Sequence, residues 1–337
     1  MSGLSLAIYW IGAVLINQAG IADKIGLFSD MMVFSQYAIQ VVMAFMMLVM
    51  IFMILPRASV SARRIGEVLD TRPAVVDGKR TDGEAGKTGE VEFQNVSFHY
   101  PDAEESVLQG ITFTAHKGET VALIGSTGCG KSTVINLIPR FYDATGGRVL
   151  VDGVDVRDYD QKALRNKIGY ISQKATLFTG TIRSNVAYGD NGRPAPSDGE
   201  VKAAVATAQA SDFVENMDGK YDGYVAQGGA NLSGGQKQRI SIARAIARKP
   251  EILIFDDSFS ALDYKTDRIL RKALAEECRD ITRIIVAQRI GTIRDADRII
   301  VLEDGRIAGM GRHEELMKNC EVYQQIALSQ LSKEELA

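Results

Sequence analysis

The chain has 337 residues, which is long enough for two domains, and its 39 basic and 42 acidic side chains give a formal net charge of −3. This balance gives no support for a nucleic-acid partner. The three cysteines, Cys129, Cys278 and Cys320, have no paired spacing, which excludes a disulfide scaffold and is typical of a reducing compartment.

The amino-terminal part has a different composition from the rest of the chain. Eight of the eleven methionines and the only tryptophan precede Pro56. Residues 4–22 and 31–55 contain no charged side chain. At about 1.5 Å per residue, each run can cross a hydrocarbon core roughly 30 Å thick. The sequence therefore predicts two membrane spans joined by a short polar turn.

Basic residues after the second run predict the orientation of these spans. Arg57, Arg63 and Arg64 place both ends of the hairpin on the cytoplasmic side. Asp30 is expected to cap the second helix, because a carboxylate suits the positive end of a helix dipole. A signal peptide is a competing interpretation of the first run, but no basic segment precedes it and a longer apolar run follows. The spans could also be a simple anchor.

A linker and a second domain follow the apolar runs. Residues 59–70 have helical spacing, whereas residues 71–89 are rich in Gly, Asp and Lys without an apolar period. The second domain is expected to begin near residue 90 and to continue to residue 331. Tyr100 follows a half-buried strand, where it could stack on an adenine ring or be an ordinary sheet tyrosine.

A glycine-rich segment lies between a predicted strand, 120–124, and a predicted helix, 134–138. It fits the pattern G-x-x-x-x-G-K-[ST], in which backbone N–H groups, the helix dipole and a lysine surround phosphate oxygens and a hydroxyl is free to ligate Mg²⁺. The sequence therefore predicts binding of a nucleoside triphosphate. Cys129 inside the segment is either a small filler or an alkylatable thiol. The segment consists of Gly125, Ser126, Thr127, Gly128, Cys129, Gly130, Lys131, Ser132 and Thr133.

Two further segments carry groups suited to the same chemistry. Residues 231–239, read as NLSGGQKQR, open a helix that is expected to run to about Arg248, and its amino terminus, with free N–H groups and a positive dipole end, forms an anion site. The strand 252–256 ends in Asp256, placed to hold Mg²⁺ through water, and is followed by Asp257, placed to act on an attacking water. Gln173 ends another predicted strand, where a glutamine is usually a turn residue.

The phosphate loop, LSGGQ and FDDSFSALD, in this order and spacing, resemble the nucleotide-binding domain of an ATP-binding cassette (ABC) transporter. The two preceding runs resemble the last two of the six helices of an exporter half-transporter. The fold implied is an α/β P-loop NTPase preceded by an α-helical transmembrane hairpin. It divides the chain into residues 1–70 (membrane part), 71–89 (linker) and 90–331 (nucleotide-binding domain).

The resemblance also assigns roles to individual residues. Tyr100 matches the aromatic residue that stacks on adenine, and Gln173 matches the glutamine that joins Mg²⁺ to the membrane-domain contact. Asp263 matches an aspartate at the dimer contact. The signature that closes on ATP held by the opposite subunit is matched by Ser233, Gly234, Gly235 and Gln236.

Two positions depart from the pattern of an active site. Asp257 stands where the family has glutamate, and Gln288 stands where it has histidine. A misplaced carboxylate costs on the order of 10²-fold in rate, and loss of a general base costs roughly 10²–10⁴-fold. We therefore expect this chain to bind ATP, to hydrolyse it slowly through Lys131, Asp257 and Gln288, and to be the degenerate-site half of a heterodimer. A slow homodimeric exporter and a regulatory ATP-binding subunit remain alternatives.

The resemblance further implies location and partners. The chain is expected in a bacterial plasma (inner) membrane, with the nucleotide-binding domain in the cytoplasm. ATP and Mg²⁺ are the expected ligands. The expected partners are a second half-transporter, the lipid bilayer and an exported small molecule, lipid or peptide, and no nucleic acid. Because four further helices would precede the two runs, we infer a truncated gene, an internal start or a fragment that would not transport by itself.

Overall fold

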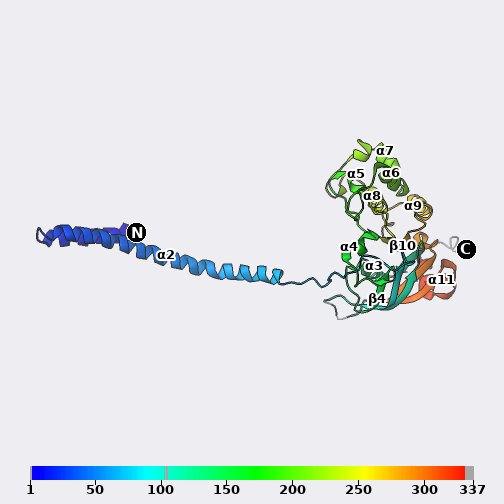
Figure 1. Ribbon diagram of the computed structural model, residues 1–337, viewed down its shortest axis with the longest axis horizontal. Helices are drawn as coiled ribbons and strands as arrows, with labels where there is room; N and C mark the ends of the chain where they lie inside the picture. Colours follow the sequence, from blue (N-terminus) through cyan, green and yellow to red (C-terminus); the bar gives the residue numbers. More distant parts are fainter. Residues whose placement is uncertain (1, 102, 104, 331–337) are drawn as a thin grey trace. The chain divides into compact units, whose positions relative to one another are not determined.

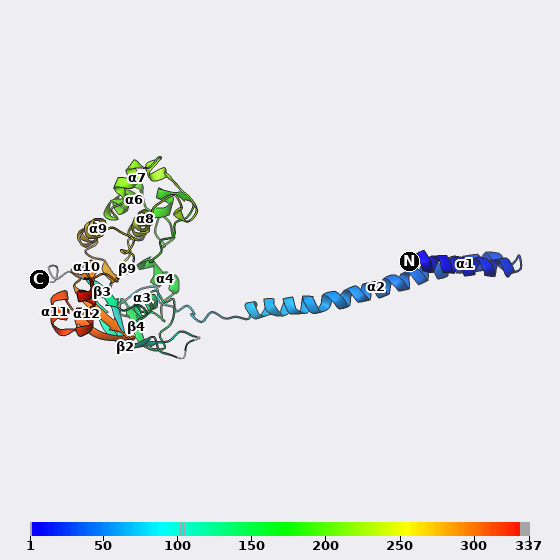
Figure 2. The same cartoon turned by 180° about the vertical axis from the view of Figure 1, so that it is seen from behind.

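The computed structural model describes residues 2–101, 103 and 105–330 of the chain (Figures 1 and 2). It divides into two compact units, Met1–Ala74 and Val75–Ala337. The division separates the apolar, methionine-rich part of the sequence from the part that contains the phosphate loop. The helices and strands of each unit follow from the sequence pattern of that unit.

The first unit is a pair of helices, α1 (Ser2–Gln18) and α2 (Lys24–Leu69). Among the described residues, α2 is the one helix that is long and apolar enough to cross a membrane by length and composition. The shorter α1 ends before the predicted boundary at residue 22, because the chain turns where the Asp23 N–H donates to the Gly20 carbonyl at 3.1 Å. The helices approach closely at Gly12, where a Cβ atom would lie 2.2 Å from Met31 Sδ.

Helix α2 begins before the predicted second span and continues past it. It runs from Lys24 through Pro56 to Leu69, so the segment with helical spacing, residues 59–70, continues the same helix almost to its end. The expectation that Asp30 caps it is wrong, because the helix begins at Lys24 and Asp30 lies inside it. Large apolar side chains are exposed on both helices, for example Trp10 at 74% and Met53 at 72%. Such surfaces suit lipid or other helices better than water.

The second unit contains two main sheets. Six strands lie in the order β12-β11-β3-β10-β9-β6, with parallel pairing throughout except at β12, which is antiparallel to β11. Their bounds are β3 (Thr120–Gly125), β6 (Ile168–Ile171), β9 (Ile252–Asp256), β10 (Thr282–Val286), β11 (Arg298–Glu303) and β12 (Arg306–Gly311). Four antiparallel strands lie in the order β2-β1-β4-β5, with bounds β1 (Val91–Phe98), β2 (Leu108–Ala115), β4 (Gly146–Val151) and β5 (Val154–Asp155).

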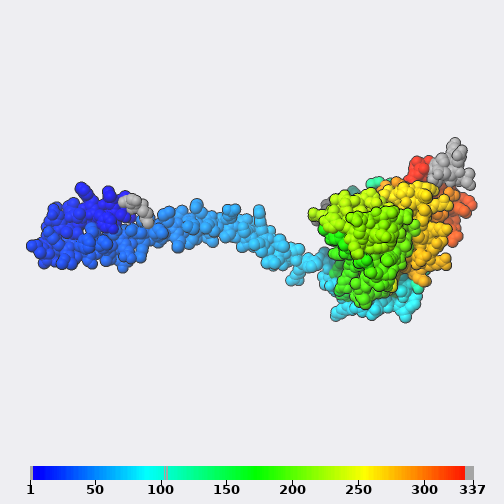
Figure 3. Space-filling view, turned by 90° about the horizontal axis from the view of Figure 1, so that it is seen from above, coloured from blue at the N-terminus to red at the C-terminus, as the bar shows by residue number. Residues whose placement is uncertain are grey.

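A group of helices gathers on one side of this unit (Figure 1), and in Figure 3 it covers much of the visible face in green. The group consists of α5 (Ile182–Val186), α6 (Asp198–Thr207), α7 (Ser211–Asn216) and α8 (Gly234–Ala247). The remaining elements are α3 (Lys131–Leu137), α4 (Gln161–Asn166), β7 (Gly180–Thr181), η1 (Lys220–Asp222), β8 (Tyr224–Val225), η2 (Gln227–Gly229), α9 (Tyr264–Glu277), α10 (Ile290–Ile293), α11 (His313–Asn319) and α12 (Glu321–Gln330).

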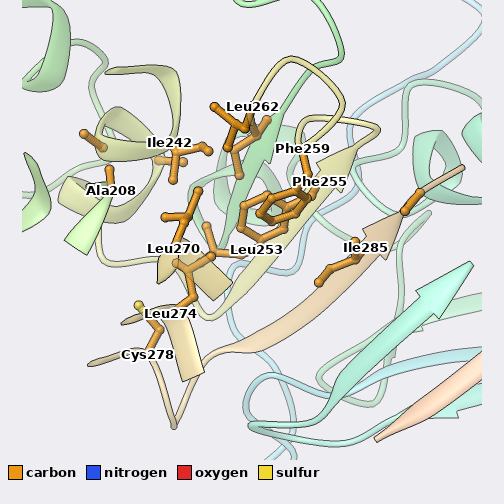
Figure 4. Packing of buried hydrophobic residues seen from close by; sticks show 14 of the residues in the cluster. Ala208, Ile242, Leu253, Phe255, Phe259, Leu262, Leu270, Leu274, Cys278 and Ile285 are labelled. Atoms are coloured by element: carbon orange, nitrogen blue, oxygen red, sulfur yellow. The ribbon is translucent and has the colours of Figure 1, made fainter. Parts of the chain in front are cut away.

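Apolar side chains form two buried clusters that hold these layers together. In the first, Phe255 of β9 and Ile285 of β10 pack with Ile242 of α8 and Leu270 of α9 (Figure 4). The second joins the two sheets and α3. Burial of each such side chain stabilises the fold by about 1.5–3 kcal/mol. The clusters therefore fix the sheet on which the site is built.

The connection between the units is shorter than the linker predicted for residues 71–89. The Gly78 N–H donates to the Tyr159 carbonyl at 2.8 Å, and the Gly89 N–H donates to Asp152 Oδ1 at 2.7 Å. The polar residues of this segment make backbone hydrogen bonds to the second unit. Composition alone does not reveal these bonds, and it therefore predicted a longer free linker.

Candidate functional site

The predicted site residues gather at one edge of the six-stranded sheet. Because β3, β6, β9 and β10 run parallel, their carboxyl ends meet at the same edge. The phosphate loop leaves β3, Gln173 follows β6, and Gln288 follows β10. Asp256 is the last residue of β9 and Asp257 follows it. Segments separated by more than one hundred residues in the sequence thus share one site.

The phosphate loop connects β3 directly to α3. Gly128 has a φ of +86°, a left-handed backbone that disfavours any other residue. Gly125 must lack a side chain, because a Cβ atom would lie 2.1 Å from the Leu302 carbonyl oxygen. Ser126, Thr127 and Gly128 are exposed, whereas Cys129 and Gly130 are buried and Gly130 precedes the first turn of α3.

Lys131 begins α3 and turns back over the loop. The side chain is only 9% exposed, and its ammonium group donates to the carbonyls of Gly125 at 2.8 Å and Ser126 at 2.7 Å. It also lies 3.6 Å from the Cys129 sulfur. The loop therefore holds a positive charge beside the free N–H groups of a helix amino terminus, which is suited to bind phosphate.

Both carboxylate oxygens of Asp256 have hydrogen-bond partners. Ser132 Oγ donates to Oδ1 at 3.1 Å. The Tyr170 hydroxyl lies 3.2 Å from Oδ2 and 3.0 Å from Asn136 Oδ1. Burial, followed by the charge of Asp256, raises the pKa of Tyr170 well above its usual value, so the phenol stays protonated. Sequence reasoning missed Tyr170 and Asn136, although the position of Tyr170 on the strand that leads to Gln173 was a usable signal.

Asp257 is held by two glutamine amides. Its Oδ2 atom accepts a hydrogen bond from Gln173 Nε2 at 3.1 Å and from Gln288 Nε2 at 2.9 Å. The residue has a left-handed φ of +46° and is 7% exposed. Burial raises the pKa of this carboxyl group, the Gln173 amide lowers it, and the nearby charge of Asp256 raises it again. Gln173 thus contacts Asp257, and not the expected metal ligand Asp256.

The segment that contains Gln288 is fixed by the carboxyl-terminal helix. Gln330, the last residue of α12, donates through Nε2 to the Gln288 carbonyl at 2.7 Å and accepts through Oε1 from the Ile290 N–H at 2.9 Å. We call residues 287–290 the switch segment. Its backbone is paired with one side chain from a distant helix, a contact that no sequence pattern indicated.

Tyr100 lies close to the phosphate loop. Its hydroxyl group is 3.1 Å from Thr133 Oγ1 on α3. The ring makes edge contacts with Phe98, at a centroid distance of 4.9 Å, and with Tyr142, at 5.3 Å. Tyr142, which sequence reasoning did not single out, is 37% exposed. Two aromatic rings therefore lie side by side near the start of α3.

The signature residues begin α8. Ser233 Oγ accepts from the Gln236 N–H at 3.3 Å, and the Ser233 N–H donates to Gln236 Oε1 at 2.9 Å, which forms a capping box. Gly234 is exposed and Gly235 is half-buried. The buried Gln238, also missed in the sequence, donates to the Ser172 carbonyl at 3.1 Å, so α8 is tied to the segment that carries Gln173.

Asp263 is placed at the amino terminus of α9. Its Oδ1 atom accepts from the Thr266 N–H at 2.9 Å, and Oδ2 accepts from Thr266 Oγ1 at 2.7 Å. These two hydrogen bonds from Thr266 lower the pKa of the carboxyl group. The side chain is exposed and is therefore a helix cap that remains accessible to other molecules.

The chemistry of these residues fits a nucleoside triphosphate with Mg²⁺. A hydroxyl and a carboxylate, Ser132 and Asp256, lie 3.1 Å apart and are the hard oxygen ligands that Mg²⁺ prefers. The glycine-lined loop beside them leaves backbone N–H groups open to phosphate. Tyr100 and Tyr142 offer rings to a base.

Known proteins with similar sequences are ABC transporters or export ATP-binding proteins. The family model described as "ABC transporter" matches residues 108–260. An uncharacterized ABC transporter ATP-binding protein of Mycobacterium tuberculosis is 43% identical over 333 residues, which cover 97% of this chain and 55% of that protein. A putative multidrug export ATP-binding/permease protein of Bacillus subtilis is 45% identical over 229 residues, which cover 68% of this chain and 39% of that protein.

A solved structure is similar to most of this chain. The structure of a bacterial Atm1-family ABC exporter with ATP bound has a TM-score of 0.76 and 33% sequence identity, over 93% of this chain and 53% of that chain. This chain spans about half the length of the relatives that it matches over nearly its whole length, for example 55% of the mycobacterial protein.

Proposed function

Because the chain contains an ABC transporter nucleotide-binding domain with exporter homologues, we propose that it is the ATP-binding and membrane subunit of an exporter. The observation that carries the proposal is the meeting of the phosphate loop, Asp256 and Asp257 at one sheet edge, in a chain that also contains the apolar helix α2. Two ATP molecules would clamp two such domains together, the membrane helices would then open outward, and hydrolysis would reset them.

The proposal places the protein in a bacterial plasma (inner) membrane, with the second unit in the cytoplasm. The exposed apolar surfaces of α1 and α2 and the exporter relatives support this location. The exported substrate would be a small molecule, a lipid or a peptide. Multidrug export appears in the names of two relatives, from Bacillus subtilis and Staphylococcus aureus.

Each residue of the edge has a role in this proposal. Lys131 and the loop N–H groups bind the β- and γ-phosphates, and Ser132 and Asp256, with Gln173 nearby, would hold Mg²⁺. Bound Mg²⁺ would neutralise part of the negative charge of the phosphates. Asp257 accepts a proton from the attacking water. Tyr100 stacks on the base, and the signature of this chain binds the ATP held by a partner.

In this proposal the site of this chain hydrolyses ATP slowly, and the contacts of Asp257 support this. One oxygen of its carboxylate is shared between the Gln173 and Gln288 amides, and the side chain is one methylene shorter than glutamate. A carboxylate held in this way is poorly placed to orient water. Gln288 donates a hydrogen bond but has no imidazole to share a proton. We therefore propose a heterodimer whose partner contributes glutamate and histidine at the other site.

The same amide contacts favour a second candidate function. A site that holds ATP without turnover would make this chain a regulatory subunit that biases its partner. Replacing Asp257 by Glu together with Gln288 by His separates the two functions. An impaired exporter site should tolerate or gain turnover, whereas a regulatory subunit should lose its effect on the partner when its nucleotide is hydrolysed.

The first test of the proposed function is the composition of the native complex. The tagged chain is purified from gently solubilised membranes of its own cell, and its partners are identified by mass. A different half-transporter in a one-to-one ratio supports the heterodimer. A complex of this chain alone that hydrolyses ATP at an ordinary exporter rate would contradict the weak-site proposal, and absence of ATP binding would contradict the function as a whole.

A further inference from the structure

Tyr170 joins three elements of the site through one hydroxyl group. It lies on β6, which pairs in parallel with β9, and it is opposite Ile254, two residues before Asp256. Its hydroxyl is 3.2 Å from Asp256 Oδ2 on β9 and 3.0 Å from Asn136 on α3. The proposed function assigns no role to this group.

The contact determines how the Asp256 carboxylate is turned. Ser132 donates to Oδ1, and Tyr170 reaches Oδ2 from the other side. A carboxylate with only one partner can rotate about its last bond, whereas one with partners on both oxygens is fixed. Groups that form hydrogen bonds to a metal ligand orient that ligand and tune its affinity for the metal ion.

The chemistry of Asn136 completes the arrangement. A phenol has one proton to donate and lone pairs that accept. The phenol faces two acceptors, Asn136 Oδ1 at 3.0 Å and Asp256 Oδ2 at 3.2 Å, and can donate its one proton to only one of them. Turning the Asn136 amide about its last bond puts Nδ2 in the place of Oδ1, so that Tyr170 accepts from Asn136 and donates its proton to Asp256. The hydroxyl thereby connects the helix that follows the phosphate loop with the strand that ends in the carboxylate.

We propose that Tyr170 is a positioning residue for Mg²⁺, whose hydroxyl group holds Asp256 in the orientation that, with Ser132, receives the metal ion. The inference rests on the proposed function, since it assumes that the loop binds a nucleotide with Mg²⁺. The ring of Tyr170 has a separate role in packing. It makes an edge contact with Phe141, at a centroid distance of 5.6 Å, and lines a surface cavity of about 300 Å³.

Because the ring and the hydroxyl group of Tyr170 make different contacts, a substitution can remove the hydroxyl group alone. In Tyr170→Phe the ring contacts remain and only the hydroxyl group is removed. Tyr159→Phe is the matched control, because Tyr159 is fully buried and its hydroxyl donates to the Val151 carbonyl at 3.1 Å, with no contact to Asp256. Thermal unfolding of the full chain in detergent shows whether both variants are folded.

The measurement is the affinity of the full chain for a fluorescent ATP analogue, once with excess Mg²⁺ and once with EDTA. Tyr170→Phe should lower the affinity with Mg²⁺ by roughly 10-fold and leave the affinity in EDTA unchanged. Tyr159→Phe should change neither. As a second variant, Asn136→Ala should give a smaller loss that also appears only with Mg²⁺.

Three results would overturn the inference, and they can be told apart. An unchanged affinity of Tyr170→Phe under both conditions shows that the hydroxyl does not position the metal ligand. An equal loss with and without Mg²⁺ shows a general structural role. If the wild-type chain binds no nucleotide under either condition, the proposed function fails and the inference fails with it.

Discussion

Substitution of Tyr100 would test how the site recognises a base. Its hydroxyl bonds to Thr133, whereas its ring is the part available to adenine. Tyr100→Phe should lower ATP affinity only slightly, because one hydrogen bond contributes about 0.5–1.5 kcal/mol. Tyr100→Ala should lose about 1–3 kcal/mol, the usual contribution of stacking on a base. Calorimetry with ATP and with tripolyphosphate checks this, since an equal loss for tripolyphosphate would indicate a damaged loop and not lost stacking.

The raised pKa of Asp257 predicts a pH dependence. Burial is the main cause, and it opposes the charged form. Only the deprotonated carboxylate can accept a proton, so ATP turnover should rise with pH through a pKa above the usual range of aspartate. Gln288→Leu removes a donor that stabilises the anion and should move this rise to higher pH. The check is kcat against pH, with Asp257→Asn as the baseline, and an unmoved profile would contradict the role of the amide.

At the scale of elements, α12 contacts the switch segment through one side chain. Gln330 pairs with the Gln288 carbonyl and the Ile290 N–H. Gln330→Ala should therefore increase hydrogen–deuterium exchange in a peptide that covers residues 287–293, by several-fold for the Ile290 amide. Gln325→Ala is the matched control, because this exposed glutamine lies on the same helix and has no described bond to the switch segment. Equal exchange in both variants would contradict the coupling.

The elements also show what local patterns can predict. The strand, loop and helix around Lys131, the strand that ends at Asp256 and the capped helix after Ser233 have short, regular signals, and the structure contains each of them. Tyr170 and Gln330 were missed because their partners are far away in sequence, 86 residues for Asp256 and 42 for Gln288. These contacts depend on a strand order that differs from chain order, and no local period encodes that order.

At the scale of the whole molecule, two motifs of this chain should affect different sites. In the proposed heterodimer, Lys131 serves the weak site of this chain, whereas Ser233 completes the competent site of the partner. Ser233→Arg places bulk and charge at the amino terminus of α8. In the purified complex it should lower ATP hydrolysis on the order of 10²-fold, as expected for loss of a phosphate-stabilising group. Lys131→Ala should lower hydrolysis only a few-fold.

The control for this pair is Ser197→Arg. Ser197 caps α6 in the same way that Ser233 caps α8, through a capping box with Glu200, so the change removes a comparable cap outside the signature. A loss of a cap costs about 1 kcal/mol of stability, which should leave hydrolysis nearly unchanged. In a homodimer every site contains both motifs, so Ser233→Arg and Lys131→Ala would abolish hydrolysis to the same extent. Equal losses would therefore contradict the asymmetric complex and favour self-association, because the same two substitutions would then reach both sites.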